Sequence, residues 1–97
     1  MKLEFSPQAR DDLLAILHFI AADKPDAATR FVTEIEKRCE LLTQFPNIGT
    51  SRDDLIPALQ VFSCRSYGIY YRVVDEVIRI ERVLSPGLDI TSGRFWN

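Results

Sequence analysis

Arginine and tyrosine side chains gather in the second half of the chain, where they could serve catalysis or binding. Residues 58–84 contain no lysine and no histidine, and their chemistry rests on Arg65, Tyr67, Tyr70, Tyr71, Arg72, Arg79 and Arg82. Metal-free RNA cleavage needs a base for the 2′-hydroxyl, an acid for the leaving oxygen and cations for the phosphate. Arginine supplies only the cations, because it stays charged, and tyrosine titrates too high to be an easy base. We therefore predict no catalytic residues and no enzymatic activity.

Three other groups of reactive residues carry weaker signals. The only histidine, His18, falls on the polar side of an expected helix, which favours a surface position over a Ser/His/Asp triad. The acidic pairs Asp11-Asp12 and Asp53-Asp54 have no third ligand at a suitable spacing, so we predict no metal site and no cofactor. Cys39 and Cys64 lie outside any CxxC motif, which favours two buried, reduced thiols.

The residue pattern predicts one strand and two helices in the first half of the chain. Lys2–Phe5 alternates polar and apolar side chains, as a half-buried strand does. Ser6-Pro7 is typical of a helix start, with serine as the N-cap and proline at the first helical position. Apolar residues recur at helical spacing from Pro7 to about Ala22 and from about Pro25 to Thr43. The short break between them predicts an antiparallel helical hairpin.

In the second half the period changes from 3.6 to 2. Turn residues at Phe45–Gly49 and a polar connector at Thr50–Asp54 precede three β-rich runs, Ala58–Cys64, Tyr67–Val74 and Val77–Leu84. Asp75-Glu76 fits a two-residue hairpin turn. Strands joined by such short turns are antiparallel, and only the helices can cover them. The prediction is a single α+β domain over residues 1–97, ordered β-α-α-β-β-β, with the helical hairpin packed on a mostly antiparallel sheet.

The alternation also divides the central strand between two faces. Period 2 places Gly68, Tyr70 and Arg72 opposite Tyr67, Ile69, Tyr71 and Val73, and the second set is the better core face. We expect the first set to lie on an open face that recognises a protein. The candidate target-binding residues are Arg52, Arg65, Tyr70, Arg72, Arg82, Phe95 and Trp96. Two alternatives stay open: these arginines could pair with Glu81, Asp75 or Glu76, and Phe95-Trp96 could dock on the domain itself.

Bulk composition narrows the classes of partner. The 97 residues carry a net charge of −2, with an isoelectric point near 5.3, whereas nucleic-acid-binding domains are usually strongly basic. We therefore expect no direct nucleic-acid binding. The chain has no signal peptide and no long apolar run, so the expectation is a cytoplasmic protein without membrane contact. A domain this short has a marginal core, which makes a stabilising partner plausible.

Four local motifs, in order, resemble the ParE/RelE superfamily of type II toxins along nearly the whole chain. They are Phe5-Ser6-Pro7-Gln8-Ala9 with Asp11-Asp12-Leu13, Phe45–Gly49 with Arg52–Leu55, Tyr67–Val73, and Ile80–Leu84. The resemblance implies the fold derived above and a cognate ParD-like antitoxin, in a hetero-oligomer with the toxin.

Two branches of this superfamily share the fold and differ in action. RelE-type toxins cut mRNA on the ribosome and are typically strongly basic, whereas ParE-type toxins bind and poison DNA gyrase. Gly68 stands where a RelE-type catalytic arginine is expected, so the resemblance implies a ParE-type gyrase inhibitor. Ser85 departs from the commonest ParE pattern, in which a histidine ends the last strand. The alternatives are a RelE-type ribonuclease and an inactive remnant that only titrates antitoxin.

Overall fold

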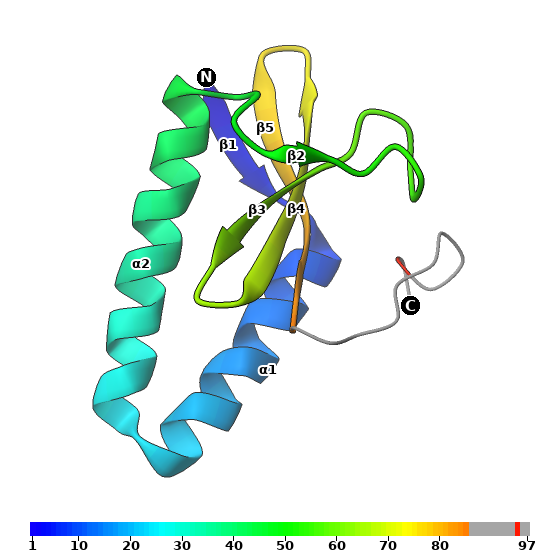
Figure 1. Ribbon diagram of the computed structural model, residues 1–97. Helices are drawn as coiled ribbons and strands as arrows, with labels where there is room; N and C mark the ends of the chain where they lie inside the picture. Colours follow the sequence, from blue (N-terminus) through cyan, green and yellow to red (C-terminus); the bar gives the residue numbers. More distant parts are fainter. Residues whose placement is uncertain (86–94, 96–97) are drawn as a thin grey trace.

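Two helices and a five-stranded sheet make up the part of the chain that the computed structural model describes, residues 1–85 and 95. Helix α1 (Pro7–Asp23) and helix α2 (Pro25–Gln44) form the expected hairpin, which lies along one side of the sheet (Figure 1). The predicted α+β architecture, with a helical hairpin packed on the sheet, is therefore confirmed.

The helix boundaries follow from their capping residues. The Ser6 hydroxyl accepts a hydrogen bond from the Ala9 amide at 3.0 Å, and Pro7 occupies the first helical turn. At the other end of α1, the Lys24 amide donates to the Ile20 carbonyl, and Pro25 then opens α2. The predicted helix ends at Ala22 and Thr43 are each one residue early.

The strands are β1 (Lys2–Phe5), β2 (Thr50–Ser51), β3 (Gln60–Cys64), β4 (Tyr67–Val74) and β5 (Val77–Leu84), in the order β1-β5-β4-β3-β2. Strand β1 pairs with β5 in parallel, and the other pairs are antiparallel. Asp75 and Glu76 have φ values of 49° and 63°, as a two-residue turn with two left-handed positions requires. The predicted hairpin turn is thus confirmed.

Two strand predictions need correction. Residues 50–51 form the short edge strand β2, paired with residues 60–61, where the sequence predicted only a connector. Strand β3 starts at Gln60 rather than at Ala58, because Ala58 has a φ of 67°, which an extended strand cannot contain. A two-residue strand is too short to show an alternating pattern in the sequence, so only its pairing with β3 identifies it as a strand.

Apolar side chains cover both faces of the sheet. Toward the helices, Ile69, Tyr71, Ile78 and Ile80 pack in one core with apolar residues of α1 and α2. On the other side, called here the outer face, a smaller cluster contains Leu55, Leu59, Tyr70 and Phe95. The predicted division of β4 between the two faces is confirmed, but the outer face is partly covered.

The Phe45–Gly49 loop is held by one core tyrosine. The Tyr71 hydroxyl lies 2.8 Å from the Pro46 carbonyl and accepts a hydrogen bond from the Gly49 amide at 3.0 Å. A Cβ atom at Gly49 would lie 2.7 Å from that hydroxyl oxygen, so the close approach needs glycine. This loop carries the chain from the end of α2 to the sheet.

Among the described residues, neither helix is long and apolar enough to cross a membrane.

Candidate functional site

A β-bulge in β5 organises the outer face. Tyr70 pairs with Arg82 while Tyr71 pairs with Ile80, so Glu81 is the extra residue between them. Ile80 and Val83 both belong to the core on the helical side. The side chains of Glu81 and Arg82 are therefore both directed to the outer face, although they are adjacent in sequence.

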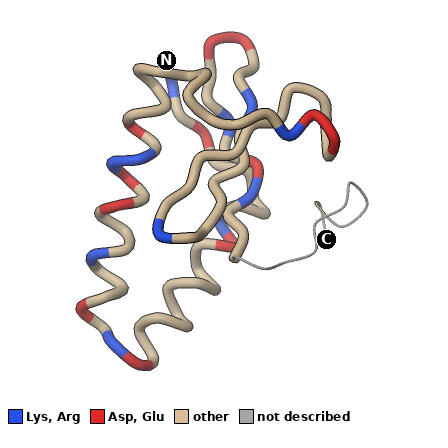
Figure 2. Tube along the Cα trace, in the orientation of Figure 1, with Lys and Arg blue, Asp and Glu red and all other residues tan. Residues whose placement is uncertain are grey.

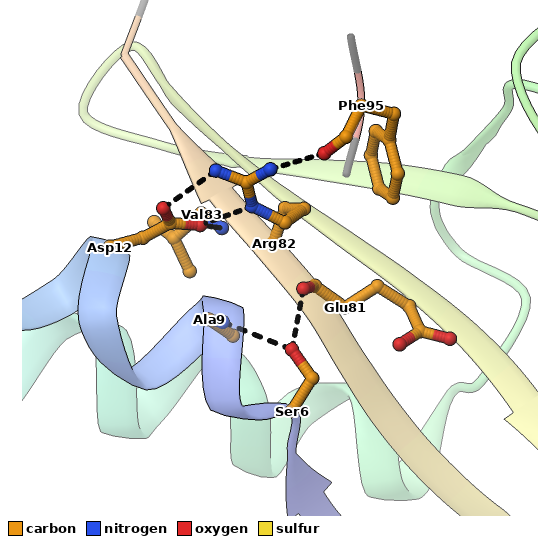
Figure 3. Close-up of polar contacts among 7 residues, drawn as sticks. All are labelled: Ser6, Ala9, Asp12, Glu81, Arg82, Val83 and Phe95. Atoms are coloured by element: carbon orange, nitrogen blue, oxygen red, sulfur yellow. Dashed lines mark hydrogen bonds and ion pairs between the residues drawn. The ribbon is translucent and has the colours of Figure 1, made fainter. Parts of the chain in front are cut away.

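The first turns of α1 hold this bulge in place (Figure 3). The buried Ser6 hydroxyl donates a hydrogen bond of 2.6 Å to the Glu81 carbonyl while it caps α1. One carboxylate oxygen of Asp12 accepts a hydrogen bond from the Val83 amide at 3.0 Å. Ser6 and Asp12, at the start of α1, thus fix the position of β5.

Arg82 is neutralised inside the molecule. Its Nε and Nη2 atoms donate to the two oxygens of Asp12 at 2.7 and 2.8 Å, and its Nη1 atom donates to the Phe95 carbonyl. The hydrogen bond to Asp12 raises the pKa of the Arg82 guanidinium. Only 8% of Arg82 is exposed, so it is a buried structural residue and not part of the open recognition surface expected from the sequence.

Phe95 docks on the domain that carries it. Its ring is fully buried and meets Tyr70 edge to face, with ring centroids 5.5 Å apart, above Leu55 and Leu59. Of the two open alternatives for Phe95, the structure shows intramolecular docking. The expectation that Tyr70 lies on an open face is wrong, because this ring and the loop over residues 55–59 cover it. Trp96 lies outside the described residues.

Arg72 remains partly accessible on the outer face. Its Nε and Nη2 atoms lie 2.8 and 2.6 Å from Oε2 of Glu81, and Nε of Arg79 donates to Oε1 of the same carboxylate at 3.1 Å. Glu81 is 1% exposed, whereas the arginine side chains are 31% and 39% exposed. The anticipated pairing of Arg72 with Glu81 is therefore present.

The two remaining candidate arginines lie away from the Arg82 site. Arg52 forms two 3.0 Å hydrogen bonds to Asp54 in the loop after β2, and this contact raises the pKa of Arg52 and lowers that of Asp54. Arg65, in the β3–β4 turn, lies 2.6 Å from Glu34 of α2. It therefore belongs to the helical side and not to the outer face.

His18, Tyr71 and the two cysteines, which could move a proton or hold a metal, lie on the helical side of the sheet. His18 is exposed on α1, and burial of the Tyr71 hydroxyl raises its pKa. Both cysteines are free and buried as predicted, and burial raises the pKa of Cys39 to about 12. Within residues 1–85 and 95, no group of three His, Cys, Asp or Glu side chains could hold a metal ion.

The family of the chain is decided by a match over nearly its whole length. The family model described as "ParE toxin of type II toxin-antitoxin system, parDE" matches residues 3–87. The chain belongs to the ParE toxin family. A curated relative, Toxin ParE3 of Caulobacter vibrioides, is 31% identical over 65 residues, which cover 67% of this chain and 65% of that protein. The match thus spans slightly less than two thirds of that relative.

Solved structures agree with this assignment. A chain of the chromosomal ParDE system from P. aeruginosa superposes with a TM-score of 0.76 and 25% identity, covering 89% of this chain and 96% of that one. The intact E. coli RelBE toxin–antitoxin complex contains a chain that matches with a TM-score of 0.57 and 18% identity over 90% and 98% of the two chains. The second likeness shows the fold alone.

Three residues of this ParE-family site were not among the sequence-based candidates: Asp12, Arg79 and Glu81. Strict alternation from Ile80 places Arg79 and Glu81 together on the outer face but Arg82 on the core face, and only the bulge explains why Arg82 joins them there. The one signal for Glu81 in the sequence was its charge within the Ile80–Leu84 motif. Asp12 is separated from Arg82 by 70 positions, so their contact required the packed fold.

Proposed function

We propose that this chain is the toxin of a type II toxin–antitoxin pair, and that it inhibits DNA gyrase by binding it. Membership of the ParE family over residues 3–87 is the observation that carries the proposal. Such a toxin would act in the cytoplasm, where its target works on DNA, and it would itself make or break no covalent bond.

The internal pairing of the arginines supports binding over RNA cleavage. Arg52, Arg65, Arg72 and Arg82 each form an ion pair with a carboxylate of the same chain. Cations compensated in this way offer little attraction to a chain of phosphates, since nucleic-acid affinity grows with the number of basic contacts. Figure 2 shows that basic and acidic residues are intermixed along the chain.

A ParD-like antitoxin is the proposed partner. The matched P. aeruginosa and E. coli structures are described as toxin–antitoxin systems, and a second protein that buries apolar surface would also stabilise so small a domain. Leu14 and Phe19 are 56% and 77% exposed on α1, which makes the helical hairpin a suitable place for an antitoxin segment.

Two assays on one purified sample test the proposal. Supercoiling by purified gyrase is measured beside mRNA cleavage on translating ribosomes, each with increasing toxin and then with added antitoxin. We expect inhibited supercoiling or trapped cleaved DNA, intact mRNA, and recovery of gyrase activity when the antitoxin is added.

Each other outcome selects a different function. Cut mRNA with unaffected gyrase would establish the RelE-type ribonuclease. Failure in both assays, together with harmless expression in cells that lack the antitoxin, would identify a remnant that only titrates antitoxin.

A further inference from the structure

The outer face carries a second group of residues, at least partly exposed, beside the cluster that Phe95 covers. The strand register pairs Arg72 with Arg79 and, next to them, Val74 with Val77. All four side chains are on the outer face, because their neighbours Val73 and Ile78 pack in the helical core. We call these four residues the β4–β5 patch.

Two arginines directly opposite each other normally repel. Here the buried carboxylate of Glu81 lies between them and accepts from both. One negative charge offsets two positive charges, so the group as a whole keeps one positive charge. The Glu81 carboxylate therefore holds both guanidinium groups in place, while part of each stays exposed.

Each guanidinium keeps N–H groups for a further acceptor. Within the described residues, Nη1 of Arg72 and both Nη atoms of Arg79 make no hydrogen bond. A second carboxylate above Glu81 would meet donors from two arginines that are already ordered. Preordered arginine forks bind carboxylates with two parallel hydrogen bonds and lose less side-chain entropy than free ones.

We infer that the β4–β5 patch is a binding site for one acidic side chain of a partner protein, set in an apolar surround. Val74, which is 43% exposed, supplies apolar contact beside the charged group, and arginine with apolar neighbours is typical of protein interfaces. The inference concerns the chemistry of the partner and does not depend on gyrase being that partner.

The surroundings favour a single carboxylate over a nucleic acid. Glu4 of β1 pairs with Arg79 of β5. Asp75 and Glu76 occupy the turn between β4 and β5, where Figure 2 shows acidic residues. Lys2 is the one basic residue that β1 places on this face. A run of phosphates would meet these acidic groups, whereas one side chain between the arginines would not.

Nuclear magnetic resonance of the full chain can test this inference directly. The Nε–Hε signals of Arg72 and Arg79 are followed while a capped peptide Ala-Leu-Glu-Leu-Ala is added, and then with the same peptide carrying Gln in place of Glu. We expect saturable shifts of both signals with the Glu peptide and at least about tenfold weaker binding of the Gln peptide, as loss of a charge-assisted contact implies.

Variants locate the site on the protein. Arg79→Gln should weaken binding of the Glu peptide about tenfold, with the dispersed amide spectrum showing that the fold is kept. Arg38→Gln is the matched control, because Arg38 is an exposed arginine that lies over Phe62 on the helical side. It should bind like wild type.

Three results would overturn the inference. These are equal binding of the Glu and Gln peptides, equal loss in both arginine variants, and larger shifts of these two signals with a single-stranded RNA dodecamer than with the Glu peptide. The last result would assign the patch to nucleic acid.

Discussion

At the scale of single residues, two arginine–aspartate pairs differ in burial and therefore in their contribution to stability. The side chains of Arg82 and Asp12 are 10% and 14% exposed, whereas those of Arg52 and Asp54 are 30% and 64% exposed, although both pairs have two short hydrogen bonds. Removal of one partner from a buried pair leaves an unpaired charge out of water, but an exposed charge is readily hydrated.

Arg82→Ala should therefore destabilise the fold far more than Arg52→Ala. We expect a loss of about 3 kcal/mol in the free energy of unfolding for the first and less than about 1 kcal/mol for the second, both measured by urea denaturation. Equal losses in the two variants would show that burial does not distinguish these pairs.

Buried neutral groups predict a loss of stability at alkaline pH. Burial raises the pKa of the Tyr71 hydroxyl above 10.0 and that of the Cys39 thiol from 9.0 to about 12. Because both folded pKa values lie above the unfolded ones, the stability they contribute is complete below the unfolded values and is lost as pH rises toward the folded values.

The urea midpoint should therefore be steady from about pH 7 to 8.5 and fall progressively above about pH 9. Tyr71→Phe should be less stable than wild type at neutral pH, because its hydrogen bonds to the loop at Pro46 and Gly49 are lost. Its further loss above about pH 10 should be smaller, because it has one buried acid fewer. A midpoint that rises with pH would contradict this account.

At the scale of elements, the bulge in β5 links the start of α1 to the outer face. The Ser6 hydroxyl serves both, since it accepts from the Ala9 amide and donates to the Glu81 carbonyl. Ser6→Ala removes the helix cap and leaves a carbonyl without its donor.

We expect Ser6→Ala to lower the free energy of unfolding by about 2 kcal/mol, since it loses a cap and a buried hydrogen bond. The matched control is Ser63→Ala, at an exposed position of β3, with a change within about 0.5 kcal/mol. Thermal denaturation followed by circular dichroism measures both. A neutral Ser6 variant would show that this hydroxyl does not anchor the bulge.

Sequence reasoning succeeded where a local period or cap decides the structure. It located both helices and assigned β4 and β5 to their residues, because capping, turn residues and alternation are local properties. It failed where one extra residue changes the alternation. Glu81 reverses the facing of every residue after it in β5, and the period alone contains no sign of that reversal.

At the scale of the whole molecule, the sheet lies between two unequal layers. The helical hairpin covers one face, and on the other a loop and Phe95 cover Tyr70. Phe95 is therefore part of the folded core, and its truncation should weaken folding.

Phe95→Ala should lower the free energy of unfolding by about 3 kcal/mol, as large-to-small changes at buried aromatics do. Urea denaturation measures it, and Phe45→Ala is the control, since Phe45 is 56% exposed and should cost much less. A loss no larger than that of the control would mean that the docked ring contributes little.

Binding to gyrase is the action proposed for this ParE-family chain. The most direct measurement is size-exclusion chromatography of gyrase with antitoxin-free toxin, with light scattering to give the mass of the complex. We predict that toxin co-elutes with gyrase and that a prior equivalent of antitoxin abolishes the co-elution. Separate elution of the two proteins, with a folded toxin that still binds its antitoxin, would contradict the account.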